Sequence, residues 1–266
     1  MRVLVTRPQQ EAQLWVNQLQ QAGLDAVALP LIAVLPAPNP QVVVQAWQQI
    51  AGMDAVMFVS GNAVDFFFSL RPQGVEVFNQ HAAATPRAFV TGPGSYAALT
   101  QRAGALAGYI NAPDAGAGQF DSEALWAVVA PQVHRGFKLL IVRGTGIEPA
   151  DAAAAGIGRD WFAQQVLQAG GVVDFVVAYQ RKCPDFSAEQ HAQVLAAAGA
   201  ESVWLLSSSE AIANLINAYP LQNWQHAQAI VTHQRIGHAA SQAGFGRVLE
   251  CRPLLSDVIT CIQTLQ

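Results

Sequence analysis

Turns that carry a hydroxyl side chain, an arginine or a glycine follow many of the short apolar segments in this chain. Where such a turn starts a helix, free backbone N–H groups and the helix dipole favour an anion. An arginine adds to this preference, because its planar guanidinium matches a carboxylate. We therefore expect these turns to bind a ligand with several carboxylate groups. The candidates are Thr6, Arg7, Ser60, Asn62, Thr91, Gly92, Ser95, Arg143, Gly144, Arg159, Ser207, Ser208 and His233.

Each turn also has a purely structural explanation. Ser207 and Glu210 have the spacing of a capping box, and Pro8 suits the first turn of a helix. An arginine near the end of a strand is as often a solubilising surface residue. We expect several of these turns to contact the ligand, without assigning that role to any particular one.

Signatures of other chemistries are weak or missing from the sequence. Residues 92–97 have the GxGxxA shape of a dinucleotide fingerprint, but Pro93 removes an N–H group that would face a phosphate. The chain has no GxxxxGK[ST] loop, no GxSxG elbow and no HExxH motif. Its histidines lack the spacing of metal ligands, and only His233 lies on one of the turns. The sequence predicts no cofactor and no metal, and a reaction that the substrate largely performs on itself.

Composition argues against several classes of protein. A net charge of −4 without a Lys/Arg cluster predicts no nucleic-acid partner. No apolar run approaches the roughly 20 residues of a membrane span, and the run before Arg7 is too short for a signal peptide. Cys183, Cys251 and Cys261 lack CxxC spacing, which predicts reduced thiols. We expect a cytoplasmic protein without membrane contact.

Strand-like segments alternate with helical patterns from one end of the chain to the other. This alternation predicts parallel sheets with helices on both faces. A length of 266 residues with 52% apolar residues is enough for two domains, each with its own core. The expected strands, which suggest two five-stranded sheets, are residues 2–5, 26–29, 55–59, 88–90, 107–110, 139–142, 172–177, 203–206, 229–231 and 248–250.

An internal duplication indicates how the domains are connected. Residues 56–60 resemble residues 204–208, and residues 89–91 resemble residues 230–232, at offsets of roughly half the chain. The two halves are cyclically offset, so the chain must cross between the domains twice. Two adjacent linkers predict a hinge and a ligand cleft between the domains, because ligands bind beyond the carboxyl ends of parallel strands. The predicted parts are residues 1–35 with 181–266, the inserted residues 36–180, and linkers at about residues 30–40 and 176–184.

A set of motifs in a fixed order and spacing resembles the uroporphyrinogen-III synthase family along essentially the whole chain. The resemblance implies two HemD-like α/β domains of flavodoxin-like type, joined by a two-stranded linker and free of any cofactor. The family commonly has a threonine at a helix start in each half. This chain has Ser95 in one half and residues 233–236 in the other, which favours recognition by backbone N–H groups. Residues 145–157 look like an insertion. The matching motifs are residues 3–8, 29–32, 54–60, 62–64, 90–94, 122–125, 140–144, 158–159, 177–179 and 181.

The resemblance also implies a substrate and a reaction. The family's substrate is hydroxymethylbilane, a linear tetrapyrrole with acetate and propionate arms. Loss of the ring A hydroxyl gives an azafulvenium cation, which ring D attacks to form a spiro intermediate. Fragmentation and reclosure with ring D inverted give uroporphyrinogen III. Because closure without inversion is spontaneous, the enzyme must hold the chain ends and stabilise the cation. Tyr179 matches the family tyrosine that assists departure of the hydroxyl.

Two other classes of function stay open at this point. Paired α/β domains with a hinge also suit a non-catalytic receptor that closes on an anionic small molecule. An enzyme that uses a nicotinamide or a flavin would require a bound cofactor. We expect a monomer, with a transient contact to the preceding enzyme of the pathway as its one protein partner.

Overall fold

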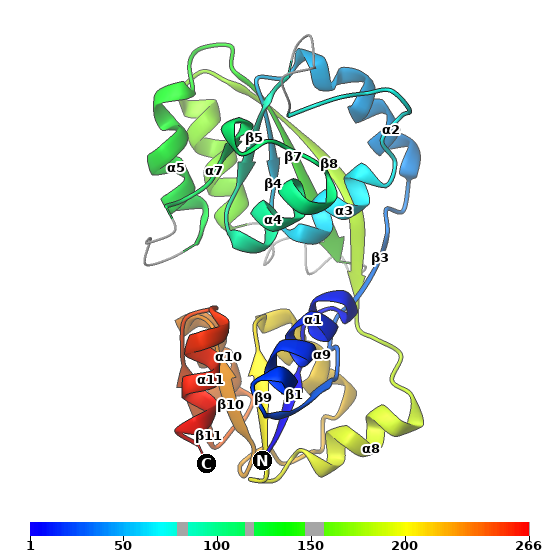
Figure 1. Ribbon diagram of the computed structural model, residues 1–266, viewed down its shortest axis with the longest axis vertical. Helices are drawn as coiled ribbons and strands as arrows, with labels where there is room; N and C mark the ends of the chain where they lie inside the picture. The colour runs from blue at the N-terminus through cyan, green and yellow to red at the C-terminus, as the bar shows by residue number, and fades with distance from the viewer. Residues whose placement is uncertain (79–84, 115–119, 147–156, 266) are drawn as a thin grey trace. The chain divides into compact units, whose positions relative to one another are not determined.

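The computed structural model describes residues 1–78, 85–114, 120–146 and 157–265, with the side chains of Arg102 and residues 157–160 outside the description. The chain forms two compact units (Figure 1). Unit 1 comprises Met1–Ala33 and Lys182–Gln266, and unit 2 comprises Val34–Arg181. These boundaries fall beside the expected ones at 35/36 and 180/181.

Unit 1 contains a five-stranded sheet in the order β11-β10-β9-β1-β2, with all neighbouring strands parallel. The first strand of the chain therefore lies inside the sheet, between β2 and β9. The strands are β1 (Arg2–Val5), β2 (Asp25–Ala28), β9 (Ser202–Leu206), β10 (Gln228–Val231) and β11 (Arg247–Glu250). The helices are α1 (Gln9–Gln21), α8 (Ala188–Ala196), α9 (Ser209–Ala218), α10 (Gln234–Gln242) and α11 (Leu255–Gln263).

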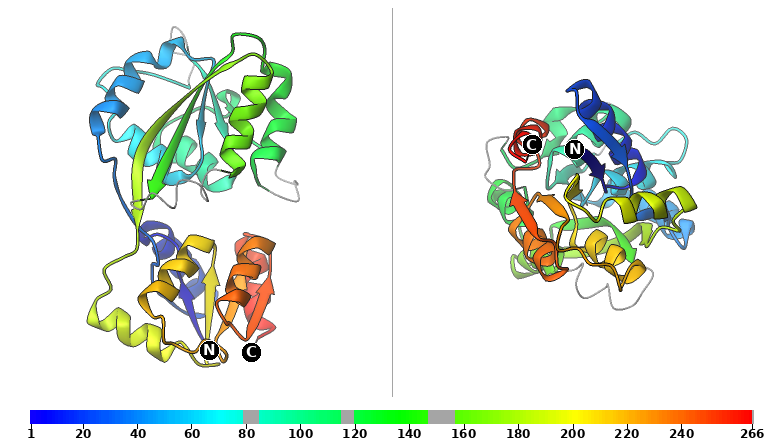
Figure 2. Two further views of the ribbon diagram at one scale, coloured as in Figure 1. Left: turned by 180° about the vertical axis from the view of Figure 1, so that it is seen from behind. Right: turned by 90° about the horizontal axis from the view of Figure 1, so that it is seen from below.

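Both faces of the unit 1 sheet carry cores. Val3 and Val203 pack with α1 and α11 on one face. Trp204 points to the opposite face, because side chains alternate along a strand. There Trp204 contacts Trp224 and Phe245, and its indole N–H donates to the Ala197 carbonyl at 2.9 Å. Figure 2 shows the helices of this unit from two further directions.

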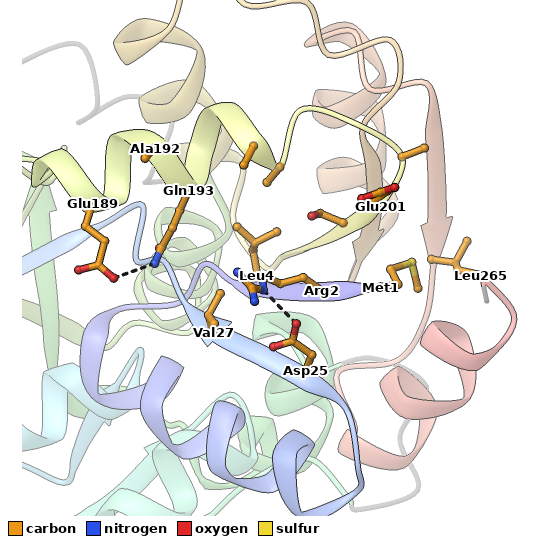
Figure 3. A pocket seen from close by; sticks show the side chains of 14 residues that line it. Met1, Arg2, Leu4, Asp25, Val27, Glu189, Ala192, Gln193, Glu201 and Leu265 are labelled. Carbon is orange, nitrogen blue, oxygen red and sulfur yellow. Dashed lines mark hydrogen bonds and ion pairs between the residues drawn. The ribbon is translucent and has the colours of Figure 1, made fainter.

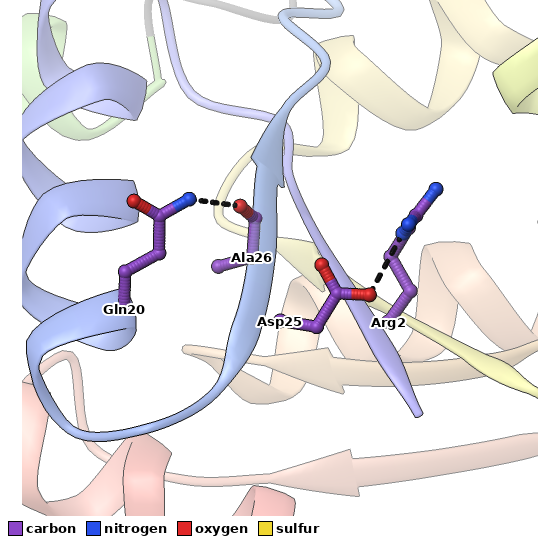
Figure 4. Close-up of polar contacts among 4 residues, drawn as sticks. All are labelled: Arg2, Gln20, Asp25 and Ala26. Atoms are coloured by element: carbon purple, nitrogen blue, oxygen red, sulfur yellow. Dashed lines mark hydrogen bonds and ion pairs between the residues drawn. The ribbon is translucent and has the colours of Figure 1, made fainter.

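The edge strand β2 is attached at its start by two side chains (Figure 4). Gln20 of α1 donates to the Ala26 carbonyl at 2.9 Å, and Arg2 of β1 pairs with Asp25 at 3.0 Å. The ion pair is about half exposed and therefore adds little stability. The pair matches the register of the two strands, in which Arg2 lies opposite Asp25.

Unit 2 contains a six-stranded sheet in the order β3-β8-β7-β4-β5-β6. The pairings among β8, β7, β4, β5 and β6 are parallel. The strands are β3 (Ala33–Pro36), β4 (Ala55–Phe58), β5 (Arg87–Val90), β6 (Ile110–Asn111), β7 (Lys138–Gly146) and β8 (Val172–Lys182). The helices are α2 (Pro40–Gln49), α3 (Gly61–Phe68), α4 (Pro93–Ala97), α5 (Ser122–Val129) and α7 (Ile157–Gln168).

Helices cover both faces of the unit 2 sheet (Figure 1). One face carries α2, α3 and α4, with Val56, Leu140 and Val142 in the shared core. The other face carries α5 and α7, which pack on Leu139 and Ile141. Neighbouring residues of β7 therefore face opposite sides, as strand geometry requires.

Three details differ from the sequence prediction. The second sheet has six strands instead of five, because β3, expected only as an extended crossover, pairs with β8. Residues 107–110 are not one strand: Ala107–Tyr109 form a 3₁₀ turn, closed by the Tyr109 N–H and the Leu106 carbonyl at 2.9 Å, before β6. Strands β7 and β8 are longer than predicted, since pairing continues to Gly146 and Arg181.

Candidate functional site

The carboxyl ends of β5, β4, β7 and β8 lie next to one another in the unit 2 sheet. Thr91 follows β5, Ser60 follows β4, and Gly144 and Tyr179 lie near the ends of β7 and β8. The parallel register aligns the ends of β4 and β7, with Phe58 opposite Val142. Part of the predicted set thus lies at a single edge of this sheet.

Tyr179 contacts other residues at this end of the sheet. Its side chain is buried, with 2% of its surface exposed. Its hydroxyl lies 3.0 Å from the Ser60 hydroxyl. The Phe66 ring stacks on the Tyr179 ring with centroids 5.9 Å apart and planes inclined by 23°. A buried phenol oxygen with a hydrogen-bonding partner is held in one orientation.

Ser60 occupies this place because it caps α3. Its backbone is extended, and its hydroxyl accepts a hydrogen bond from the Ala63 N–H at 3.1 Å. This is the usual role of a serine directly before a helix. The same oxygen contacts Tyr179, so one side chain serves both the helix and the phenol.

A β-bulge in β8 aims the Tyr179 ring. Arg143 pairs with Val177 while Gly144 pairs with Tyr179, which leaves Ala178 as the extra residue. Val176, Ala178 and Tyr179 consequently all contribute to the core under α3. Strict alternation after Val176 and Ala178 would have turned Tyr179 to the opposite face.

Gly144 provides the space for this ring. A Cβ atom at Gly144 would lie 2.3 Å from Cζ and 2.4 Å from Cε2 of Tyr179. Such separations are far below carbon–carbon contact distance. Gly144 was expected to bind ligand through a turn at a helix start. The expected turn is wrong, because β7 continues through Gly146 and Gly144 lies within the strand.

Arg143 points away from Tyr179. It follows Leu139 and Ile141 on the α5 and α7 face of the sheet, and its guanidinium carbon lies 4.5 Å from the centre of the Phe175 ring. This is the geometry of a cation–π contact. The structure does not bring Arg143 together with Tyr179 and Ser60, although the sequence places it one residue before Gly144.

The other unit 2 candidates differ in accessibility. Asn62 and Thr91 are half-buried, and Ser95 is buried with 5% exposure. Gly92 precedes α4 with extended backbone and no side chain that could cap the helix. Arg159 lies in α7, but its side chain is outside the described residues, as is most of the expected insertion at residues 145–157.

Unit 1 brings a second set of candidates to the ends of its central strands. Thr6 is buried, and its hydroxyl donates to the Leu205 carbonyl at 2.6 Å. Arg7 lies 3.3 Å from Glu11 and 4.7 Å from the centre of the Trp15 ring. Both side chains therefore have structural partners within the unit.

The serine and histidine turns of unit 1 cap helices. Ser208, not Ser207, is the cap of α9, and its hydroxyl accepts from the Glu210 N–H at 3.2 Å. The capping box inferred for Ser207 is therefore wrong by one residue. His233 caps α10, since its Nδ1 accepts from the Arg235 N–H at 3.0 Å. An accepting Nδ1 leaves Nε2 of a neutral ring as a donor.

Unit 1 also contains hollows in its surface. A cavity of about 1100 Å³ lies between α8 and the starts of β1 and β2, away from the strand ends that carry the candidates (Figure 3). Leu4, Val27, Ala192 and Ala196 give it apolar walls. A second hollow, of about 600 Å³, runs along α10 and includes His233.

Shifted pKa values occur at thiols and a phenol outside these candidate sets. Burial, followed by the neighbouring Cys261, raises the pKa of Cys251 to about 12. Burial and Asp185 raise the pKa of Cys183, and burial and Cys183 raise the pKa of Tyr219. The raised pKa values argue against Cys183 and Cys251 as nucleophiles, because a cysteine nucleophile needs the thiolate.

Among the described residues, no three His, Cys, Asp or Glu side chains cluster as metal ligands would. Among those residues, too, no helix has the length and apolar character needed to cross a bilayer.

The fold and the polar strand ends define a class of protein, the doubly wound α/β proteins that bind ligands at the carboxyl ends of parallel strands. Residues 13–256 match the family model of uroporphyrinogen-III synthase HemD. The chain belongs to this family, which agrees with the resemblance seen in its motifs. The family acts on a tetrapyrrole and is a class of cyclising lyase.

Solved structures confirm the predicted fold class. The chain is similar to a mutant uroporphyrinogen III synthase from the extremely thermophilic bacterium Thermus thermophilus, with a TM-score of 0.57 at 12% identity over 100% of this chain and 98% of that one. It is also similar to uroporphyrinogen-III synthetase from Helicobacter pylori, with a TM-score of 0.54 at 14% identity over 100% of both chains. At these identities the likeness concerns the fold.

Proposed function

We propose that this chain converts hydroxymethylbilane to uroporphyrinogen III with inversion of ring D and loss of water. Membership of the family carries this proposal. The local geometry supports it, because a buried phenol hydroxyl lies at the carboxyl edge of the unit 2 sheet.

In this mechanism Tyr179 donates a hydrogen bond to the departing hydroxyl group. The carbon–oxygen bond breaks as the pyrrole nitrogen supplies electron density, and the hydroxyl leaves as water with the phenol proton. Ring D then attacks the cation, and the spiro intermediate fragments and recloses inverted. The proton lost when the final ring regains its aromaticity restores the phenol. Acid assistance of this kind is typically worth ~10²-fold or more, and less where the substrate itself expels the leaving group.

In each unit, considered by itself, we assign the binding of carboxylate arms to polar strand ends. In unit 2 we assign Asn62, Thr91, Gly92 and Ser95 to this role, through side chains and free N–H groups. In unit 1 the contacts come from Arg7, Ser207, Ser208 and His233, while Thr6 shapes its turn through the bond to Leu205. Holding several arms at once fixes the chain ends of the substrate, which favours the inverted product over spontaneous closure.

The proposal also covers the location of the protein, its oligomeric state and its protein partner. We assign the protein to the cytoplasm, in agreement with the three free thiols. We further assign it a monomeric state. We also assign it a transient contact with the preceding enzyme of the pathway, because free hydroxymethylbilane closes spontaneously to the wrong isomer.

Product analysis tests the proposed function. Purified protein is incubated with hydroxymethylbilane without added metal or nucleotide, and the oxidised products are separated by chromatography. We expect mainly the type III isomer. Only the type I isomer, formed at the rate without enzyme, would refute the assignment. Tight binding without turnover would instead favour a receptor.

A further inference from the structure

We propose that Ser60 is a positioning residue for Tyr179 rather than a ligand of the substrate. The Ser60 hydroxyl donates its hydrogen bond to the phenol oxygen and leaves the phenol proton free for the departing hydroxyl. This inference rests on the proposed function, since it concerns the same reaction. It assigns Ser60 a role different from the one its sequence motif suggests.

The hydrogen-bonding capacity of Ser60 leads to this direction. A serine hydroxyl has one donor and two acceptor positions. One acceptor position is taken by the Ala63 N–H at 3.1 Å, and the phenol oxygen lies 3.0 Å away. An N–H bond into the oxygen polarises the serine O–H and makes it a better donor, because linked hydrogen bonds strengthen one another. The Ser60 proton therefore points to the oxygen of Tyr179.

The start of α3 adds a second reason. The eight-residue helix begins at Gly61, and its dipole places partial positive charge beside Ser60. When Tyr179 gives its proton to the leaving hydroxyl, negative charge develops on the phenol oxygen. The Ser60 O–H then stabilises this charge, and the Ala63 N–H supports Ser60. The chain of donors runs from the helix backbone through Ser60 to Tyr179.

Gly144 and Phe66 make the arrangement rigid. The ring of Tyr179 lies directly over the Cα of Gly144, and Phe66 stacks on the ring. The phenol oxygen has little freedom to turn away from Ser60. A group fixed before the substrate arrives loses little entropy in the reaction, which is what a positioning residue provides.

A double-mutant cycle tests the inference in the full-length protein. The variants are Ser60→Ala, Tyr179→Phe and the combination, with hydroxymethylbilane turnover and product isomers as readouts. We expect Ser60→Ala to lower kcat about tenfold with little change in KM, since the substrate contacts stay. Tyr179→Phe lowers kcat by roughly tenfold to ~10²-fold. In the Tyr179→Phe background, Ser60→Ala should cause no further loss, because the phenol oxygen is already absent.

Ser187→Ala separates this role from helix capping. Ser187 caps α8 and accepts from the Gln190 N–H at 3.2 Å, the same three-residue spacing as Ser60 and Ala63. Both alanine variants should lose a similar few degrees of melting temperature, but only Ser60→Ala should lose turnover. Ser60→Thr keeps a capping hydroxyl and should restore most of the rate.

Three other results would overturn the inference. A raised KM with unchanged kcat in Ser60→Ala would make Ser60 a substrate ligand. Additive losses of kcat in the double variant would show that Ser60 acts independently of Tyr179. An equal loss of rate in Ser187→Ala would show that the effect of Ser60→Ala comes only from lower stability. Wild-type protein that forms no type III isomer would refute the proposed function itself, a result distinct from all of these.

Discussion

Replacing Gly144 by alanine tests whether the position of the Tyr179 ring matters to catalysis. The new Cβ would lie 2.3 Å from Cζ, 2.4 Å from Cε2 and 2.8 Å from Cε1 of Tyr179. Because carbon atoms pack at about 3.5 Å or more, the ring must move by roughly 1 Å. A shift of this size changes the position of the phenol hydroxyl, which lies 3.0 Å from the Ser60 hydroxyl.

Two magnitudes follow for Gly144→Ala. Forcing a methyl group into a filled core costs about 1–3 kcal/mol of unfolding free energy. Displacing the phenol removes its help to the leaving group, so kcat should fall by roughly tenfold to ~10²-fold, as for Tyr179→Phe. The loss of kcat should vanish in the Tyr179→Phe background, whereas the loss of stability should remain, since the phenylalanine ring fills the same space.

The assay combines chemical denaturation with steady-state turnover and isomer analysis. Gly52→Ala is the matched control, because Gly52 lies in the same unit and a Cβ there meets no atom within 4 Å. It should keep wild-type stability to within about 0.5 kcal/mol, and wild-type turnover. Wild-type turnover in Gly144→Ala would refute the reasoning, since the ring would then tolerate displacement or contribute nothing.

Three further changes probe other parts of the molecule. Arg143→Ala should leave KM within about twofold and cost about 0.5–1 kcal/mol for the lost stacking on Phe175; a tenfold rise in KM would return Arg143 to the binding site. Folding raises the pKa of the Cys251 thiol from 9.0 to about 12. The thiol therefore contributes its full share of the unfolding free energy below about pH 9, and this share is lost as the pH rises towards 12. Denaturation at several pH values should show this alkaline decline, and Cys251→Ala should flatten it; an identical decline in the variant would rule out this thiol. A fragment of residues 36–180 should melt cooperatively by itself, because its sheet takes nearly all its strands from this range; a molten fragment would count against the domain boundary.

The sequence predicts the class of fold because both units follow simple rules. Alternating strands and helices require parallel sheets, and nearly every expected strand appears in the structure. Helix caps were less predictable. The sequence indicated a cap only at Ser207, and the structure has it one residue later, at Ser208. Ser60 was expected to contact the ligand, and its capping of α3 is known only from the structure.

Other features depend on contacts that no local pattern contains. The prolines at positions 30, 36, 38 and 40 make residues 33–36 look extended, but only pairing with β8 makes them a strand. Residues 144–146 have the composition of a turn, yet pairing with β8 keeps them in β7. The stacking partner of Tyr179 was missed altogether. Phe66 stands in a run of three phenylalanines, and the sequence does not show which of them faces the tyrosine.

The β-bulge in β8 makes the number of residues in this strand, rather than their identity, decide where the phenol points. Deleting Ala178 would remove the extra residue, restore regular pairing and still leave the tyrosine opposite Gly144. Adding one residue before Tyr179 without a second bulge would turn the ring to the face that holds Phe175. In this family, one further residue at this point should therefore redirect the tyrosine, whereas the loss of Ala178 alone should not.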